Sequence, residues 1–62
     1  MKVGTRVEAK VPVDEQGGYV RMPGYVDMVV DGTDCRVLFD DRLIYGGTGR
    51  AWFPESELMV LV

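Results

Sequence analysis

The sequence predicts an all-β domain, a small and strongly bent barrel of five strands, on three observations. Apolar and polar residues alternate with a period of two in several short segments, which is the pattern of half-buried strands. Glycine and proline separate these segments, and eight glycines in 62 residues supply the bends that a tightly curved sheet needs. No segment shows the 3.6-residue period of an amphipathic helix.

The first strand is expected at Arg6–Val11, where charged and apolar residues alternate. Its charged residues would face water, and the inward set would be Val7, Ala9 and Val11. Pro12 has no N–H to donate and therefore ends or displaces the ladder. The polar, glycine-rich segment Asp14–Gly18 is the expected tip of a long hairpin.

The second strand is expected in two pieces. The chain is extended at Tyr19–Met22, is interrupted by Pro23-Gly24 as a turn or bulge, and resumes at Tyr25–Val30. Strict alternation would give this second piece two different faces. One face would carry Val26, Met28 and Val30, and the other would carry Tyr25, Asp27 and Val29.

The third strand is expected at Cys35–Phe39, after a tight hairpin turn at Asp31–Asp34, because Asp-Gly readily adopts positive φ angles. One face of this strand would carry Cys35, Val37 and Phe39. Residues 40–49 then form a loop with three glycines. This loop holds an unusually apolar segment, either a cover for the barrel or an exposed interaction patch, made of Leu43, Ile44 and Tyr45.

The fourth strand is expected at Arg50–Phe53, where the adjacent Trp52 and Phe53 point to opposite faces, one in the core and one exposed. A single 3₁₀ turn at Pro54–Glu57 precedes a closing strand at Leu58–Val62. Five short strands with hairpin connections and a turn before the last strand are typical of an SH3-like barrel. An OB-like barrel ranks second, because it would carry a helix where the glycine-rich loop lies.

Composition is consistent with one domain spanning residues 1–62. A chain of this length buries only about 60% of the surface that its unfolded form exposes. Small folds therefore often need a disulfide, a bound metal or oligomerisation for stability. The single cysteine excludes an intrachain disulfide, and the absence of histidine argues against a structural zinc site. The hydrophobic content is nevertheless 47%, so either the barrel packs efficiently or another copy or partner covers apolar surface.

The net charge and the N-terminal residues indicate which kinds of partner and which cellular location to expect. A net charge of −3 makes nucleic acid an unfavoured partner and favours a cationic one. No apolar run approaches the roughly 20 residues of a membrane helix. Met1–Gly4 lacks the apolar core of a signal peptide. Together with the free cysteine, this predicts a cytoplasmic setting.

The residue types for catalysis are missing. Neither Cys35 nor Ser56 has a histidine that could serve as its base. Asp40 and Asp41 diverge at a strand end and have no third ligand close in sequence, which argues against a metal or a carboxylate pair. The glycines of residues 46–49 lack the Gly-Lys-Ser/Thr ending of a phosphate-binding loop. We therefore expect no enzyme activity, no cofactor and no metal.

The chain resembles a Tudor-type domain in four segments that together span most of its length. They are Gly4–Ala9, Met22–Gly24, Val37–Asp41 and Trp52–Leu58. The resemblance implies an SH3-like fold. Tudor domains that read methylated lysine or arginine hold the cation in an aromatic cage, with cation–π attraction of about 0.5 to 2 kcal/mol per contact.

The resemblance also implies site residues. Phe39 and Asp41 match the cage positions of the third strand. The alternative for Phe39 is a place in the core, because it shares a strand face with Cys35 and Val37. Two aromatic residues of the cage are absent. Val11 or Pro12 occupies the position after the opening strand, and Met22 occupies the position before Pro-Gly. Substitute walls would come from Tyr19, Tyr25 or Trp52.

A second resemblance is to the plasmid-type dihydrofolate reductases, short SH3-like chains that assemble as tetramers around a pore. Their ligands lie against a Val-Gln-Ile-Tyr-Pro strand. The corresponding segment here, Arg50–Pro54, lacks the glutamine and the tyrosine hydroxyl.

The leading hypothesis is a non-enzymatic binding module that recognises a peptide or protein through an aromatic–acidic rim. Its expected ligand-binding residues are Tyr25, Phe39, Asp41, Trp52 and Tyr19, with Leu43, Ile44 and Tyr45 as an interaction patch. One alternative is a homo-oligomer with a small-molecule site in a shared cleft. Another is a weak nucleic-acid-binding module that uses a basic strip of Arg36, Arg42 and Arg50.

Overall fold

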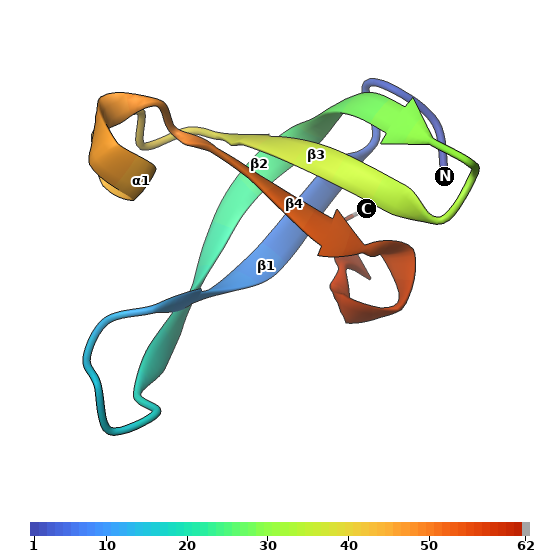
Figure 1. The fold of residues 1–62 in the computed structure, drawn as a ribbon. Helices are drawn as coiled ribbons and strands as arrows, with labels where there is room; N and C mark the ends of the chain where they lie inside the picture. The colour runs from blue at the N-terminus through green and yellow to red at the C-terminus, as the bar shows by residue number, and fades with distance from the viewer. Residues whose placement is uncertain (62) are drawn as a thin grey trace.

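A computed structural model describes residues 1–61, and Val62 of the expected closing strand lies outside the described residues. The chain forms one five-stranded antiparallel sheet in the order β4-β3-β2-β1-β5 (Figure 1). The elements are β1 (Arg6–Pro12), β2 (Tyr19–Val30), β3 (Asp34–Phe39), α1 (Ile44–Gly47), β4 (Arg50–Pro54), η1 (Glu55–Glu57) and β5 (Met59–Val60). The predicted all-β fold, with a 3₁₀ turn before the last strand, is confirmed. Within residues 1–61 no helix has the length and apolar character to cross a bilayer.

The long strand β2 belongs to both halves of the bent sheet. Its first part pairs with β1 and its second part pairs with β3, and the two pairings overlap at Gly24 and Tyr25. The predicted interruption at Pro23-Gly24 is wrong, because the strand runs through both residues. Pro23 causes no break, since its nitrogen faces away from β1. Gly24 lets β3 approach closely, because a Cβ there would lie 2.6 Å from the Leu38 carbonyl oxygen.

A β-bulge at Asp27 changes which residues of β2 face the core. The register against β3 shifts between Val26 and Met28, so the alternation of faces reverses at this point. Val26 is fully buried, and Val29 lies opposite Cys35 and packs against the core. Met28 faces outward and is exposed. The predicted shared face of Val26, Met28 and Val30 is therefore wrong beyond Val26.

The core lies between the inner faces of the strands. Its buried members are Val7, Ala9, Val11, Val26, Cys35, Val37 and Phe39, so the inward faces predicted for the first and third strands are confirmed. The Phe39 ring stacks on Tyr45 at a centroid separation of 5.8 Å and meets Phe53 edge-on at 6.0 Å. Phe53 is half-buried and its neighbour Trp52 is exposed, as their adjacency predicted.

The turns between β1 and β2 and between β2 and β3 are stabilised by residues within the turns themselves. Asp31 and Gly32 both have positive φ angles, 55° and 73°, which confirms the predicted tight hairpin turn. The Asp14 carboxylate accepts the amides of Gln16 and Gly18, both at 2.9 Å, and so ties the tip of the β1–β2 hairpin.

Two segments differ from the expected elements. The loop at residues 40–49 contains α1, in which Tyr45 and Gly46 have positive φ, so α1 consists of tight turns and not of a continuous helix. The closing strand is shorter than predicted, because the Leu58 amide bonds back to the Glu55 carbonyl and ends η1. Only Met59 and Val60 remain as β5.

Candidate interaction surface

The outer face of β2, β3 and β4 brings aromatic and charged residues together. In register, Arg36 lies between Met28 and Trp52, and Leu38 lies between Tyr25 and Arg50. Residues that stand opposite one another on neighbouring strands share a face of the sheet. With Asp27 from the bulge they form a surface that we call the Trp52 face, made of Tyr25, Asp27, Met28, Arg36, Leu38, Arg50 and Trp52.

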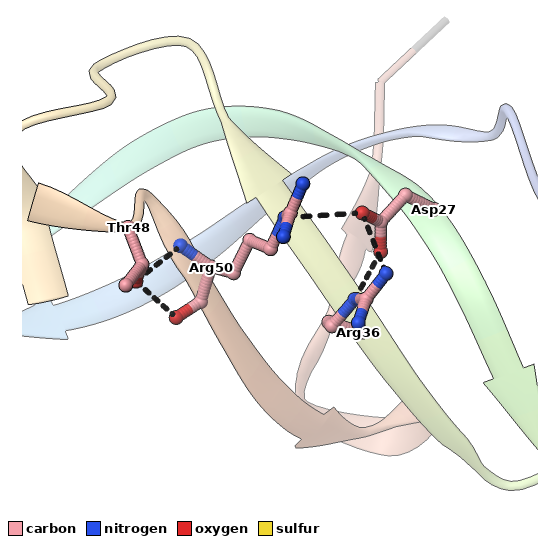
Figure 2. Close-up of polar contacts among 4 residues, drawn as sticks. All are labelled: Asp27, Arg36, Thr48 and Arg50. Atoms are coloured by element: carbon pink, nitrogen blue, oxygen red, sulfur yellow. Dashed lines mark hydrogen bonds and ion pairs between the residues drawn. The ribbon is translucent and has the colours of Figure 1, made fainter.

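One carboxylate serves two arginines on this face (Figure 2). Asp27 Oδ1 accepts Arg36 Nε at 2.7 Å, and its Oδ2 accepts Arg36 Nη2 at 3.2 Å. Arg50 Nε lies 3.6 Å from the same Oδ2, which is an ion pair without a short hydrogen bond. The exposed fractions of the Asp27, Arg36 and Arg50 side chains are 15%, 26% and 52%. Arg36 is therefore fixed, whereas Arg50 keeps most of its donors free.

Charge on the Trp52 face is opposite in sign to that of the whole chain. Two guanidinium groups and one carboxylate leave a local charge of +1 in a chain of net −3. The hydrogen bond from Asp27 raises the pKa of Arg36 further above its ordinary value, so this cation stays charged.

Trp52 supplies the largest exposed aromatic surface beside these charges. Its side chain is 49% exposed, and Arg36 Cζ lies 6.0 Å from the ring centroid. That distance is at the outer limit of a cation–π contact. Tyr25 is half-buried at the other end of the face. Tryptophan, tyrosine and arginine are the residue types that most often carry binding energy in protein interfaces.

The structure does not assemble the aromatic–acidic rim expected from the sequence. Phe39 has no exposed surface, so its assignment to a ligand-binding rim is corrected to the core. The Asp41 carboxylate accepts the Leu43 amide at 2.9 Å and closes a turn. Asp40 is bound by Arg6, whose two terminal nitrogens each contact one carboxylate oxygen. This hydrogen-bonded contact lowers the pKa of Asp40 below its ordinary value.

Tyr19 lies far from the Trp52 face. It is six residues from Tyr25 along β2, which corresponds to about 20 Å at the usual rise of a strand. Its ring is half exposed, and Lys10 Nζ lies 4.6 Å from the ring centroid. Tyr19 and Tyr25 therefore cannot wall one small pocket.

The expected apolar patch is divided by the fold. Ile44 packs against the core, and Tyr45 stacks on Phe39 with its phenol partly buried, which raises the pKa of Tyr45. Leu43 is 84% exposed. Ile44 and one side of the Tyr45 ring thus cover one end of the core, while Leu43 is open to solvent and Tyr45 remains 37% exposed.

Sequence reasoning missed the residue that organises the site. The alternation pattern groups Asp27 with Tyr25 and Val29 on one face of the strand, but it does not predict that Asp27 is the shared acceptor for Arg36 and Arg50. The available signal was a carboxylate within an apolar strand, between Val26 and Met28. A half-buried charge needs a partner, and the arginines of the two strands that follow in the sequence, β3 and β4, could supply it.

A cleft lies on another part of the molecule, beside η1 and β5. Its volume is about 380 Å³, and it is lined by Lys10, Arg21, Phe53, Ser56, Glu57, Leu58 and Met59. This volume is near the lower end of the range for small-molecule sites. Among residues 1–61, no group of three or more histidine, cysteine, aspartate or glutamate side chains is placed to hold a metal ion.

Comparison of the chain with protein-family models, with curated proteins and with solved structures returned no match.

Proposed function

We propose that this protein is a non-enzymatic binding module that docks a peptide segment of a protein partner on the Trp52 face. The observation that carries the proposal is a half-exposed tryptophan beside two arginines that share one carboxylate. A large aromatic ring next to incompletely neutralised arginines is the combination of side chains that is enriched at protein interfaces. A partner that covers the ring and completes the charge balance gives this arrangement a role.

The face fits a segment that carries carboxylates next to an apolar side chain. Arg50 has a 52% exposed side chain and one loose contact, so its guanidinium can take a carboxylate in bidentate fashion. The flat ring of Trp52 offers apolar area to a neighbouring leucine or isoleucine. The cationic partner favoured by overall charge fits this face less well, because Asp27 is already occupied by two arginines.

The two contributions differ in size. An exposed ion pair such as one to Arg50 typically contributes about 0.2 to 1 kcal/mol. Truncation of a tryptophan that is buried at an interface typically costs about 2 kcal/mol or more. Trp52 should therefore set the affinity, while Arg50 should set the preference for acidic over basic segments.

Trp52 is the only tryptophan of the chain, so its fluorescence reports binding directly. The probes are a blocked peptide of alternating glutamate and leucine and a matched peptide of alternating lysine and leucine. We expect the acidic peptide to bind more tightly and to shift the emission to shorter wavelength. Asp27→Asn should tighten acidic-peptide binding severalfold, because it removes the competing carboxylate, and Arg50→Gln should weaken it.

The matched control is Arg42→Gln, which removes an exposed arginine in the loop before α1 and should leave binding unchanged. Tighter binding of the basic peptide, or equal effects of Arg42→Gln and Arg50→Gln, would contradict the proposal.

Small-molecule binding in the cleft is a second candidate function. The supporting observation is a cleft of about 380 Å³ in which Lys10 and Arg21 lie near apolar Phe53 and Met59. Such a mixture suits a small amphipathic anion. A fragment screen by NMR tests it: shifts at these four residues would support the site, and shifts confined to other regions would exclude it.

We also propose a cytoplasmic setting for the module. Cys35 is a free thiol with no exposed surface, and burial raises its pKa, so it stays a protonated and unreactive core residue. Imaging of the tagged protein in its native cell would test this, and an extracellular signal would contradict it.

A further inference from the structure

The free backbone edges of the sheet differ in how well they can accept another strand. In an antiparallel ladder, successive residues face alternately toward and away from the neighbouring strand. The register of each pair therefore shows which amides point outward. Residues 1–61 contain three such edges: β4, the side of β1 and β5, and the first part of β2.

The β4 edge is nearly closed. Hydrogen bonds from Phe39 to Gly49 and from Glu55 to Thr33 fix the register, so Arg50, Trp52 and Pro54 face away from β3. The Arg50 amide donates to Thr48 Oγ1 at 3.3 Å (Figure 2), and Pro54 has no N–H. One outward donor remains on this edge, the Trp52 amide.

The other side of the sheet is limited in the same way. β5 pairs with Val7 and Glu8 of β1 and leaves the rest of that strand uncovered. In the uncovered part Lys10 and Pro12 face away from β2, and Pro12 has no N–H. β5 itself has two residues, of which Val60 faces away from β1. Each of these edges offers a single donor, which is too little to hold an added strand.

The first part of β2 is different. The bond from the Val13 amide to the Gly18 carbonyl fixes the register, so Tyr19 and Arg21 face away from β1. β3 pairs with β2 only from Gly24 onward. The amides and carbonyls of Tyr19 and Arg21 therefore form an open edge on the far part of the β1–β2 hairpin, which extends away from the other strands (Figure 1).

We propose that two copies of this chain pair through this edge, antiparallel, about a two-fold axis at Val20. Tyr19 of each copy then lies opposite Arg21 of the other. Their amides and carbonyls make four backbone hydrogen bonds across the axis. This contact is separate from the Trp52 face and does not depend on the proposed function.

The residues at this edge are complementary to themselves in that register. An arginine opposite a tyrosine gives a favourable cross-strand pair on each side of the axis, and Val20, which is 45% exposed, meets its own copy on the other face. An axis at Arg21 would oppose two like charges and bring Pro23, without an N–H, opposite Tyr19. An axis at Tyr19 would leave Arg21 opposite Gly17 of the hairpin tip.

The balanced charges of the β1–β2 hairpin and the hydrogen bonds that fix its tip support the pairing. Lys10 and Arg21 balance Asp14 and Glu15, so two hairpins meet without net repulsion. The bonds of Asp14 to the Gln16 and Gly18 amides hold the tip in shape before association. The contact is narrow, well below the roughly 1,200 Å² of a standard interface, so the dimer is expected to be weak and reversible.

The experiment uses the full chain made by chemical synthesis, with one backbone amide N-methylated in each variant. N-methylation of Arg21 removes an outward donor of the proposed edge, and N-methylation of Trp52 removes the outward donor of β4 as a matched control. Sedimentation equilibrium from micromolar to millimolar concentration measures the mass. Circular dichroism confirms that both variants are folded.

We expect the unmodified chain and the Trp52 variant to approach twice the monomer mass with rising concentration, while the Arg21 variant stays monomeric. Val20→Glu, which places like charges at the axis without touching a backbone donor, should also stay monomeric. A monomeric unmodified chain at millimolar concentration would overturn the proposal. Dimerisation of the Arg21 variant, or selective loss of the dimer in the Trp52 variant, would overturn it as well.

Discussion

The Thr48 hydroxyl accepts the outward-facing amide of Arg50 at 3.3 Å while it donates its own hydrogen to the Tyr45 carbonyl at 2.9 Å. A side chain in the turn after α1 thus occupies the first outward donor of β4. Because Pro54 closes the other end of the strand, β4 exposes the Trp52 side chain and a single outward backbone donor. This closure favours the proposed docking on the face of the sheet over the addition of a strand at the β4 edge.

Thr48→Val should open the β4 edge. The isosteric change removes the acceptor of the Arg50 amide and should cost about 1 kcal/mol of unfolding free energy. Hydrogen exchange at the Arg50 amide, followed by NMR, should become as fast as exchange at the Trp52 amide, which already faces solvent. Unchanged protection of Arg50 would show that Thr48 does not hold this amide.

Phe39→Leu should destabilise the fold without changing peptide binding. The ring is fully buried between Tyr45 and Phe53, so its loss leaves a cavity and should cost about 1 to 3 kcal/mol in a urea titration. The reciprocal variant is Trp52→Leu, which should change stability by less than about 1 kcal/mol but abolish tight peptide binding. A folded Phe39→Leu protein with reduced peptide affinity would restore Phe39 as a binding residue.

Gly24→Ala should separate β2 from β3. The added Cβ would lie 2.6 Å from the Leu38 carbonyl oxygen and 2.9 Å from Val37 Cγ1, and the backbone oxygen cannot move away without breaking the ladder. We expect a loss of about 1 to 3 kcal/mol by chemical denaturation. Gly17→Ala in the hairpin tip is the control, because its φ is strained but nothing lies within 4 Å. Faster amide exchange along β3 should appear in the Gly24 variant alone.

The contact between Arg6 and Asp40 should make stability depend on pH in the acidic range. The bidentate contact favours the charged carboxylate and lowers the pKa of Asp40. Its stabilising contribution is therefore complete above the unfolded pKa of about 3.9 and is lost as the pH falls through the lower folded-state value. Carbon-detected NMR titration should show the Asp40 pKa returning to its ordinary range in Arg6→Gln.

Thermal unfolding supplies the second readout of this pair. The melting temperatures of the parent chain and Arg6→Gln should differ at neutral pH and converge in strong acid. Arg21→Gln, which within one copy of the chain loses only a 4.0 Å contact with Glu8, is the control at concentrations below those of the proposed dimer and should leave the Asp40 pKa unchanged. A constant difference between the parent and Arg6→Gln at all pH values would show that Arg6 stabilises by packing alone.

The strands that keep a regular alternation were predictable from the sequence. β1 and β3 place their inward residues as expected, because neither strand contains a bulge that changes the phase. β2 was not predictable in its second half. The bulge at Asp27 is selected by tertiary packing, since it carries Val29 to Cys35 in the core and releases Met28 to solvent.

The candidate site depended on how the strands pair. The contacts of Asp27 with Arg36 and Arg50 join three strands, so they follow from the pairing of β2 with β3 and of β3 with β4, which the alternation within one strand does not reveal. The exposure of Trp52 and the burial of Phe53 could be inferred only as a pair of alternatives, because adjacency in a strand does not say which face is the core. Phe39 is the last residue of β3 and belongs to the core, while Asp41 follows the strand and closes a turn.

The most direct test of the account is an NMR titration of the ¹⁵N-labelled chain with the glutamate–leucine peptide. We predict that the largest shifts fall on the Trp52 indole Nε1–H and on the Nε–H groups of Arg36 and Arg50. Shifts gathered around Arg21 and Met59 at the cleft, with the Trp52 indole unchanged, would contradict the central claim that the Trp52 face is the binding surface.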